Sequence, residues 1–287
     1  MSLLENKFKD KIKVVILCAG EGKRLKEITR TRPKPLLRIK ALDNEPILYN
    51  TIKQLIDLGI KRIGIVVGHL GNMINNFIVK IQQSNKSLYS KISVINSKNE
   101  YKRGPLHSFL SITNVPGFFI SESIYVLIPG DIIFDFGLLK EIFSLILKSK
   151  KEINDAPFFF YRKINQKILK ELRTKKKLIS LVEIKQIEQY NILIKIHQVK
   201  LKSILYNFNL MQTIPVCVLN YKYINKILSL KKKNFFKTIW ETINYLISKG
   251  DKIYAFEVAN NLRFHDIDNE HDLRYIHKKK EDNRRSD

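Results

Sequence analysis

The sequence predicts an α/β fold with a doubly wound, mostly parallel, Rossmann-like sheet, helices on both faces, and a small mixed β lobe toward the C-terminal half. Strand and helix patterns alternate over about the first 150 residues, which is typical of a parallel sheet with right-handed crossovers. The strand patterns of this half are continuous apolar runs, as expected for strands buried on both faces. Beyond it, strand-like runs follow one another without evident helices, which favours a mixed lobe.

The first predicted strand is Lys13–Cys18 (KVVILC), which ends at Ala19 and Gly20. The first helix pattern opens at Pro46, a residue favoured in the first turn, and closes at Gly59. In the rest of this half we expect strands at Arg62–Gly68, Ile92–Asn96 and Ile124–Ile128, and helices at Asn72–Ile81, Leu106–Ile112 and Leu138–Leu147.

The C-terminal half consists mainly of strand patterns. Asn269 is expected to cap a last helix, with Asp272 three residues later as its capping-box partner. The other expected elements are a helix at Phe235–Ile247 and strands at Ala156–Tyr161, Leu178–Ile184, Ile192–Ile196, Ser203–Tyr206, Val216–Leu219 and Lys252–Val258.

These patterns predict a single domain over residues 1–278, with one half at about 13–150 and a second half at about 151–275. Residues 279–287 are rich in Lys and Arg, and we expect them to form a basic flexible tail.

The composition is that of an ordinary soluble protein, with 44% apolar and 28% charged residues. No apolar run reaches the roughly 18 residues that a membrane span needs. The N-terminus is polar and has no signal-peptide core. Cys18 and Cys217 lie in apolar runs without metal-ligand spacing, so we expect buried free thiols in a reducing compartment. We therefore expect a cytoplasmic protein that does not contact membranes.

The net charge of +25 is the one unusual bulk property. A charge of this size can mark a polyanionic partner. The lysines are spread along the whole chain, however, and no stacking aromatic residues are interleaved with them as in single-strand binding surfaces. We interpret the charge mainly as a bias of composition, which makes nucleic acid an unlikely partner.

The loop after the first predicted strand is the strongest candidate for a binding site. Gly20 and Gly22 follow the carboxyl end of that strand, where open α/β sheets bind ligands. Glycine there lets the backbone approach a base or a phosphate closely. The spacing matches neither the dinucleotide fingerprint nor a P-loop. Arg24 and Lys34 could bring two cations to a triphosphate, although the same residues could also form a tight turn with surface charges.

This block resembles the signature of the sugar-phosphate nucleotidyltransferases, which have a GT-A-like Rossmann fold. The resemblance rests on G-x-G-x-R-L at Gly20–Leu25 and on the T-x-x-R-P-K-P-L-like segment that ends at Leu37. Further similar pieces follow in family order and extend the resemblance over roughly residues 13–275: Glu45–Leu48, Ile65–Gly71, Gly130-Asp131 and His265–Asp268.

The resemblance implies a reaction in which a sugar-1-phosphate or a phospho-alcohol attacks the α-phosphorus of a nucleoside triphosphate and expels pyrophosphate. It implies that Arg24 contacts the departing phosphates and that Lys34 contacts the α-phosphate. Positioning and neutralisation of charge are the main requirements of such a displacement. By the same resemblance, Leu17, Ala19, Gly20 and Gly22 would line the nucleotide.

Magnesium is the cofactor that the resemblance implies, with Asp131 and Asp266 as its protein ligands. Two carboxylates, phosphate oxygens and water suit this hard cation. Asp268 is an alternative to Asp266, because it lies two residues further on. Asp135 could be another acidic neighbour, but we expect it to cap the helix that begins near Gly137.

The segment Gly104–Ser108 stands where the family has a loop that surrounds the base, and Gly104, Pro105 and Ser108 are therefore candidate nucleotide contacts. A serine at the last position resembles the cytidylyltransferases that activate inositol phosphate or phosphocholine. His107 is expected to pack or to contact the base, because a phosphate nucleophile arrives ionised and needs no general base.

The acceptor half departs from the family pattern. No lysine stands clearly in register at Lys202–Tyr206, where many relatives have one that contacts the sugar phosphate. Pro215 replaces a common glycine. Lys185, Lys195 or Lys200 could supply the missing cation.

The sequence therefore predicts a Mg²⁺-dependent nucleotidyltransferase that acts on a nucleoside triphosphate and a sugar-phosphate or phospho-alcohol. It leaves the base, the acceptor and the oligomeric state open, and a homo-oligomer is possible. The altered acceptor side leaves one alternative: a non-catalytic regulatory or scaffold paralogue that keeps the fold. Retention of Arg24, Lys34, Asp131 and Asp266 together favours the enzyme.

Overall fold

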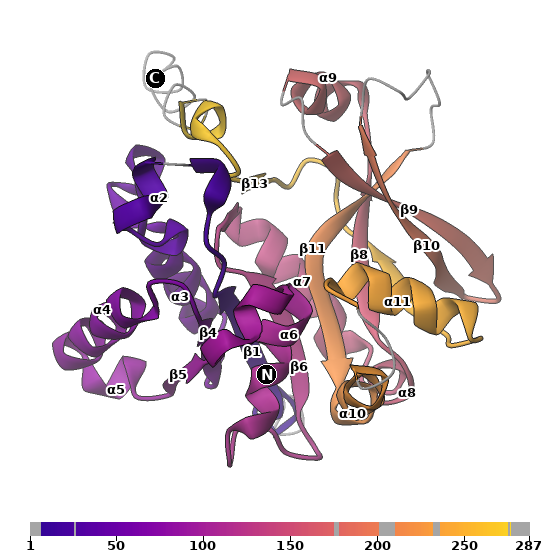
Figure 1. The fold of residues 1–287 in the computed structure, drawn as a ribbon. Coiled ribbons are helices and arrows are strands. Elements are labelled where there is room, and N and C mark those ends of the chain that lie inside the picture. Colours follow the sequence, from indigo (N-terminus) through magenta and orange to yellow (C-terminus); the bar gives the residue numbers. More distant parts are fainter. Residues whose placement is uncertain are drawn as a thin grey trace.

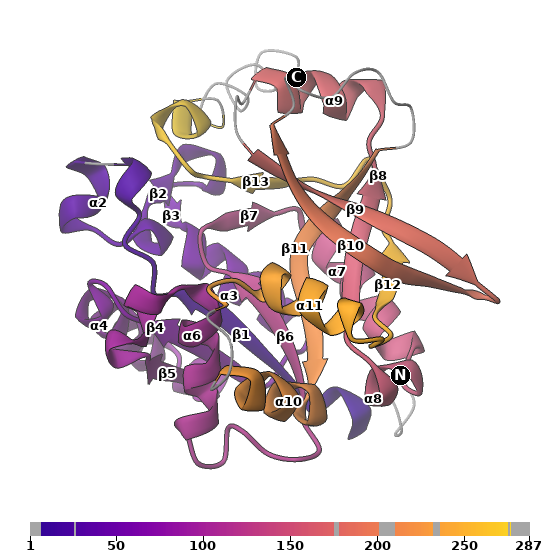
Figure 2. The ribbon, with the colours of Figure 1, turned by 45° about the vertical axis from the view of Figure 1, so that its right-hand side comes forward.

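The protein was analysed in a computed structural model, which describes residues 7–25, 27–174, 178–200, 210–231, 236–274 and 276. The strand predicted at Ser203–Tyr206 and the tail predicted at 279–287 lie outside these ranges. Figures 1 and 2 show a twisted central sheet with helices packed on both of its faces. In the described part of the chain, no helix has the length and apolar character required to cross a membrane.

Parallel strands form one half of the sheet, as the sequence predicts. Their order is β5-β4-β1-β6, and β1 pairs in parallel with both β4 and β6. The order of these strands in the sheet differs from their order along the chain, because helices connect parallel strands by crossovers. The strands are β1 (Ile12–Cys18), β4 (Ile63–Val67), β5 (Ile92–Asn96) and β6 (Ile124–Pro129).

The other half of the same sheet is mixed. From β6 the order continues β11-β8-β12-β10-β9, with β11 antiparallel to β6 and to β8, and with β12 parallel to β8. The predicted fold class is confirmed, and the mixed lobe joins the parallel half edge to edge. These strands are β8 (Phe158–Lys163), β9 (Leu178–Ile187), β10 (Tyr190–Lys200), β11 (Met211–Asn220) and β12 (Tyr254–Glu257).

Each face of the sheet carries its own hydrophobic core. Val14 and Ile16 of β1 belong to the cluster on one face, whereas Val15 belongs to the cluster on the other face. Because successive side chains alternate between faces, a strand covered on both sides is mostly apolar, which explains the continuous run Val14–Cys18 in β1. The first core contains α3 (Ile47–Asp57), α4 (Gly71–Ser84) and α7 (Phe136–Lys148), and the second contains α6 (Pro105–Leu110), α10 (Tyr221–Lys231) and α11 (Ile239–Ser248).

Two helices in the C-terminal half correct the expectation that its strands follow without helices. They are α9 (Gln166–Thr174), which lies between β8 and β9, and α10. The α9 segment is only nine residues long and has three apolar residues, Ile168, Leu169 and Leu172, so its helix pattern is short. Its first turn is fixed by the Asn165 side chain, which accepts a hydrogen bond from the backbone N–H of Ile168 at 2.9 Å.

A small antiparallel pair lies above the carboxyl end of the parallel strands. It consists of β7 (Ile132–Phe134) and β13 (Phe264–Asp266), and Asp266 stands opposite Ile132. The last helix is capped as predicted, because Asn269 Oδ1 accepts from the Asp272 N–H at 3.0 Å and Asp272 Oδ2 accepts from the Asn269 N–H at 3.3 Å. The remaining short elements are α2 (Glu27–Thr31), β2 (Arg38–Ile39), β3 (Glu45–Pro46), α5 (Lys86–Tyr89) and α8 (Glu152–Asp155).

Asp135 does not cap α7 with its side chain. It occupies the position before the first residue of the helix, which is Phe136, but it makes no side-chain capping bond there. Its carboxylate accepts instead from the backbone N–H of Arg263 at 2.9 Å. The expectation failed because a partner far along the chain, on the segment that leads into β13, takes the carboxylate.

Candidate functional site

The loop after β1 turns back on itself at Gly22. This residue has a φ of +65°, and a Cβ there would lie 2.9 Å from Cγ2 of Thr29. The Gly22 carbonyl accepts hydrogen bonds from the N–H of Leu25 and from the hydroxyl of Thr29, both at 2.9 Å. Glycine is therefore required by the turn at Gly22, whereas Gly20 is exposed and has open space around its Cα. The turn presents Arg24 above the end of β1.

Lys34 sits in a short 3₁₀ turn between Pro33 and Pro35. The side chain of this lysine is only 9% exposed, and its ammonium lies 2.7 Å from Oδ2 of Asp131 and 3.4 Å from Oδ1 of Asp268. Arg24 Nη1 lies 3.1 Å from the other carboxylate oxygen of Asp268. The structure thus brings the two predicted cations together with two carboxylates.

A small hydrophobic cluster supports this charged group from below. Its buried members come from segments far apart in the sequence, and several are immediate neighbours of the charged residues. Leu25 adjoins Arg24, and Ile267 separates Asp266 from Asp268. Burial of these apolar side chains fixes the backbone from which the charges project. The buried members are Leu25, Leu37, Ile39, Ile47, Ile133, Ile267 and Ile276.

Asp131 is positioned by the close approach of β6 to β1. The N–H of Gly130 donates to the carbonyl of Leu17 at 2.8 Å, and a Cβ on Gly130 would lie 2.4 Å from Sγ of Cys18. No side chain fits there, so Gly130 lets Asp131 follow directly from the strand. The carbonyl of Leu17 is therefore already hydrogen-bonded to Gly130. The carbonyl of the buried Ala19 accepts a hydrogen bond from the N–H of His69 at 3.2 Å.

Electrostatics keep Lys34 charged. Burial by itself lowers the pKa of this ammonium, but the nearby carboxylates of Asp131, Asp266 and Asp268 outweigh that effect and raise the pKa above its ordinary value. The lysine therefore stays protonated at any physiological pH. Arg24, by contrast, is 71% exposed on its side chain and reaches outward from the cluster.

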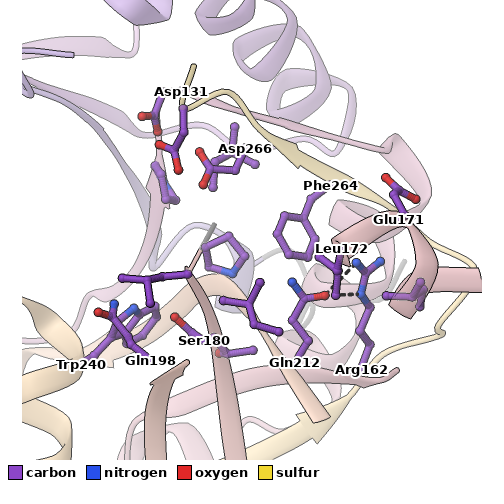
Figure 3. Close-up of a pocket in the computed structure, with 18 of the residues that line it drawn as sticks. Asp131, Arg162, Glu171, Leu172, Ser180, Gln198, Gln212, Trp240, Phe264 and Asp266 are labelled. Carbon is purple, nitrogen blue, oxygen red and sulfur yellow. Dashed lines mark hydrogen bonds between the residues drawn. The ribbon is translucent and has the colours of Figure 1, made fainter. Parts of the chain in front are cut away.

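The carboxylates face a cavity of about 370 Å³ between the two halves of the sheet. Figure 3 shows Asp131 and Asp266 on one side of the hollow, Gln212 and Arg162 on the other, and Phe264 between them. Asp266 and Asp268 both line this cavity, and so does Arg24. Further lining residues are Ile168, Glu171, Leu172, Leu178, Ile179, Ser180, Gln198, Thr213, Pro215 and Trp240.

The far side of the cavity contains a cation that the sequence did not indicate. Arg162 projects from β8, is only 5% exposed, and lies over the Phe264 ring with its guanidinium 4.9 Å from the ring centroid. It donates through Nε and Nη2 to Oε1 of Gln212, at 3.0 and 2.9 Å, and through Nη1 to the carbonyl of Leu262 at 2.8 Å. Burial lowers its pKa to about 10, against the opposing effect of Glu171. It remains positively charged at neutral pH.

The three lysines proposed for the acceptor side do not line this cavity. Lys185, Lys195 and Lys200 lie on exposed positions of the β9–β10 hairpin. The segment Lys202–Tyr206 lies outside the described residues. Pro215 does line the cavity, at a shift in the register between β11 and β8 where the pairing is interrupted. Its missing N–H therefore costs no ladder hydrogen bond.

The predicted base loop packs against the start of α11. Leu106 donates its N–H to the carbonyl of Lys237 at 3.0 Å, and Nε2 of the buried His107 lies 2.9 Å from the carbonyl of Phe236. Ser108 is also buried, and its hydroxyl donates back to the Gly104 carbonyl at 3.4 Å. In this structure, His107 thus packs against the segment before α11. Pro105 is exposed, and the described lining of the cavity includes neither Pro105 nor Gly104 or Ser108.

The donor chemistry of the carboxylate side fits a hard divalent cation. The described residues contain no group of three His, Cys, Asp or Glu side chains with metal-binding geometry. A cation held by Asp131 and Asp266 would therefore take its other ligands from a bound phosphate and from water, which is how Mg²⁺ usually binds. Together with Arg24 and Lys34, the site is suited to neutralise a polyphosphate.

Comparisons with known proteins identify the family and the fold. Residues 13–168 match the family model described as Nucleotidyl transferase. A UTP–glucose-1-phosphate uridylyltransferase of Haloferax volcanii is 27% identical over 147 residues, which are 51% of this chain and 53% of that protein, so the match spans about half of the relative's length.

Two solved structures share the fold over nearly the whole chain. UDP-glucose pyrophosphorylase in complex with UDP-glucose superposes with a TM-score of 0.68 and 16% identity, covering 94% of this chain and 98% of the other. The inositol-1-phosphate CTP transferase from T. maritima gives a TM-score of 0.63 and 21% identity, covering 91% of each chain.

Proposed function

The chain belongs to the nucleotidyl transferase family, and on this premise we propose that it is a Mg²⁺-dependent enzyme that joins a nucleoside triphosphate to a sugar-1-phosphate or a phospho-alcohol. The observation that carries the proposal is the contact of Lys34 with Asp131, 2.7 Å apart beside the carboxyl end of β6. A buried cation at this place, held among carboxylates, is suited to a substrate that brings both negative charge and a metal ion.

In the proposed reaction, an oxygen of the acceptor phosphate attacks the α-phosphorus of the triphosphate. The bond from that phosphorus to the bridging oxygen breaks, and pyrophosphate leaves with the electron pair. The acceptor phosphate is already ionised at neutral pH, so no side chain has to remove a proton. The main contributions expected from the protein are alignment and neutralisation of charge.

Each charged residue has a proposed part. Lys34 would exchange part of its contact with Asp131 for the α-phosphate, and Arg24, which is largely exposed, would move onto the departing phosphates. Asp131 and Asp266 would hold Mg²⁺. The metal would supply neutralisation of charge on the phosphate oxygens.

The cavity supports a division of the site. Its carboxylate side includes Arg24 from the loop after β1, and its far side lies between β8, β9, β10, β11 and α9. We assign the triphosphate to the first and the acceptor to the second. The two relatives described above as a uridylyltransferase and a CTP transferase act, by their names, on glucose 1-phosphate and on inositol 1-phosphate, and they support a phosphorylated sugar or polyol for this chain.

The proposal is tested by measuring pyrophosphate release with CTP, UTP, dTTP or GTP, each with glucose 1-phosphate, inositol 1-phosphate or phosphocholine. At least one pair should turn over with Mg²⁺, and removal of the metal by EDTA should abolish the reaction. Asp131→Ala should abolish it as well, whereas Asp57→Ala, an exposed carboxylate at the end of α3, should leave it unchanged. If no pair reacts in the wild-type protein, the enzyme assignment is wrong and the non-catalytic paralogue is favoured.

A further inference from the structure

The far side of the cavity contains a polar group whose orientation is fixed by its neighbour. Gln212 lies near the start of β11 and is only 6% exposed. Both Nε and Nη2 of Arg162 point at its side-chain amide, at 3.0 and 2.9 Å. A guanidinium has only donors, so the amide atom that faces it must be the oxygen. The amide nitrogen of Gln212 is therefore directed away from Arg162.

That nitrogen has no acceptor among the residues that the structure describes, since the hydrogen bonds of the Gln212 side chain all pass through its oxygen. Gln212 lines the cavity, and Figure 3 shows its amide nitrogen on the side of the hollow. Because this nitrogen is open to the cavity, a ligand oxygen or a water molecule can accept a hydrogen bond from it. The amide nitrogen of Gln212 is thus suited to donate a hydrogen bond to an oxygen atom of a ligand in the cavity.

The surrounding wall has the same neutral polar character. Ser180 of β9 and Gln198 of β10 are directly paired across the two strands, and both line the cavity. Gln212 is paired with Leu181, the residue after Ser180, so the three side chains come from adjacent strands. Hydroxyl and amide groups recognise hydroxyl groups well because both partners can donate and accept.

The one carboxylate on this wall of the described cavity is already engaged. Glu171 acts electrostatically on Arg162, and it lies 3.8 Å from Nδ1 of His265. Arg162 itself adds a fixed positive charge behind Gln212. An acceptor with a positively charged head group would therefore face the guanidinium of Arg162 and would have no carboxylate on this wall to pair with. This arrangement disfavours the binding of such an acceptor.

We propose that Arg162 and Gln212 together determine the specificity for the acceptor. In this proposal, Arg162 fixes the Gln212 amide so that the amide donates a hydrogen bond to a hydroxyl group on the sugar or alcohol part of the acceptor. The pair thereby favours acceptors whose non-reacting part carries neutral hydroxyl groups over acceptors that carry an alkylammonium group. This proposal rests on the function proposed above. Gln212 is the residue that touches the substrate, and Arg162 positions it.

The test compares inositol 1-phosphate, glucose 1-phosphate and phosphocholine as acceptors, by steady-state kinetics and by calorimetric titration of each acceptor. A hydroxylated acceptor should be preferred by the wild-type protein. Gln212→Leu should raise the KM and the Kd for that acceptor roughly 10-fold or more, because a buried substrate hydroxyl loses its partner. The KM for the triphosphate should not change. Gln186→Leu, at an exposed glutamine of β9 that does not line the cavity, is the matched control.

Two further variants separate recognition from folding. Gln212→Glu keeps the size of the side chain and its contact with Arg162 but removes the hydrogen-bond donor. It should therefore lower the affinity for hydroxylated acceptors without lowering the affinity for phosphocholine. Arg162→Met should raise the same KM, and its effect should not add to that of Gln212→Leu, because both changes remove one interaction.

The outcomes distinguish this proposal from the function on which it rests. If the wild-type protein turns over but prefers phosphocholine, or if Gln212→Leu and Gln212→Glu leave the affinity for the hydroxylated acceptor unchanged, the proposed specificity is wrong and the enzyme assignment stands. Equal losses for acceptor and triphosphate would also overturn it, since they would indicate a general structural defect. Absence of any turnover and of any acceptor binding would contradict both the proposed specificity and the proposed enzyme function.

Discussion

Oδ2 of Asp131 lies 2.7 Å from the ammonium nitrogen of Lys34, although the two residues are 97 positions apart in the chain. The contact joins the N-terminal loop to the end of β6. It also keeps a buried positive charge and a proposed metal ligand in register before any substrate binds. Asp266 and Asp268 also act on the same lysine and stabilise its positive charge.

Replacement of Lys34 by methionine should damage both stability and catalysis. It leaves three carboxylates close together without their cation, and we expect the free energy of unfolding to fall by about 3 kcal/mol. Turnover should fall by at least about 100-fold, because a fixed positive charge on the reacting phosphate is lost. Chemical denaturation and pyrophosphate release measure the two effects. An active Lys34→Met protein would contradict the assigned role, and Lys40→Met, at an exposed position directly after β2, is the control.

Gly130→Ala should distort the site through packing. The new Cβ would lie 2.4 Å from Cys18 Sγ and 2.8 Å from the Leu17 carbonyl, so β6 must move away from β1. We expect a loss of about 2 kcal/mol in stability and a large loss of activity, since Asp131 follows directly. Gly20→Ala is the matched comparison, because nothing lies within 4 Å of a Cβ there. Thermal unfolding of the two variants should differ clearly, with Gly20→Ala close to the wild type.

Asp266 and Asp268 should differ in their response to magnesium. If Asp266 is the metal ligand, Asp266→Asn should raise the Mg²⁺ concentration for half-maximal activity roughly 10-fold or more. Asp268 contacts Arg24 and Lys34, so Asp268→Asn should act mainly on the KM for the triphosphate. A titration of activity with Mg²⁺ for both variants decides between them. The reverse pattern would assign the metal to Asp268.

Lys13 should give the protein a pH-dependent stability in the alkaline range. Burial in β1, and then repulsion from Arg62, lower the pKa of this lysine to about 8, while its ammonium donates to the carbonyls of Gly117 and Phe118. The unfolded state keeps the ordinary pKa of 10.5, so between pH 8 and 10.5 it binds more protons than the folded state. Stability therefore gains a contribution that rises with pH in this window.

The variant Lys13→Met should lack that contribution. The free energy of unfolding of the wild type relative to the variant should increase from pH 8 to pH 10.5, whatever their difference at neutral pH. Urea denaturation at several pH values measures it. Parallel curves for the two proteins would show that Lys13 is not the titrating group.

The carboxylate side of the site could be predicted from sequence because its signals are local. A buried strand, then Gly130, then Asp131, indicates a carboxylate at the edge of a parallel sheet, and the glycines after β1 indicate a close turn. The choice between Asp266 and Asp268 could not be made from spacing, because Ile267 is the buried residue between them and both carboxylates reach the cavity.

The far side could not be predicted in the same way. Arg162 and Gln212 meet because β8 pairs with β11, where these two residues stand directly opposite each other. Nothing near Gln212 in the sequence marks it as more than a polar residue at the start of a strand. The one available signal was Arg162, a charged residue directly after the apolar run Phe158–Tyr161. Helix α9 was missed because its helix pattern is short, although it brings Glu171 to the cavity.

The pairing of β7 with β13 determines when the two carboxylates of the site can come together during synthesis of the chain. Asp131 lies one residue before β7, and Asp266 is the last residue of β13, so the two carboxylates meet only when the end of the chain has joined the middle. On a ribosome, a nascent chain that has emerged only to residue 260 would contain the complete glycine loop, Arg24, Lys34 and Asp131. If Asp266 is the second metal ligand, as proposed, such a chain would still be inactive, because this carboxylate would not yet have left the exit tunnel.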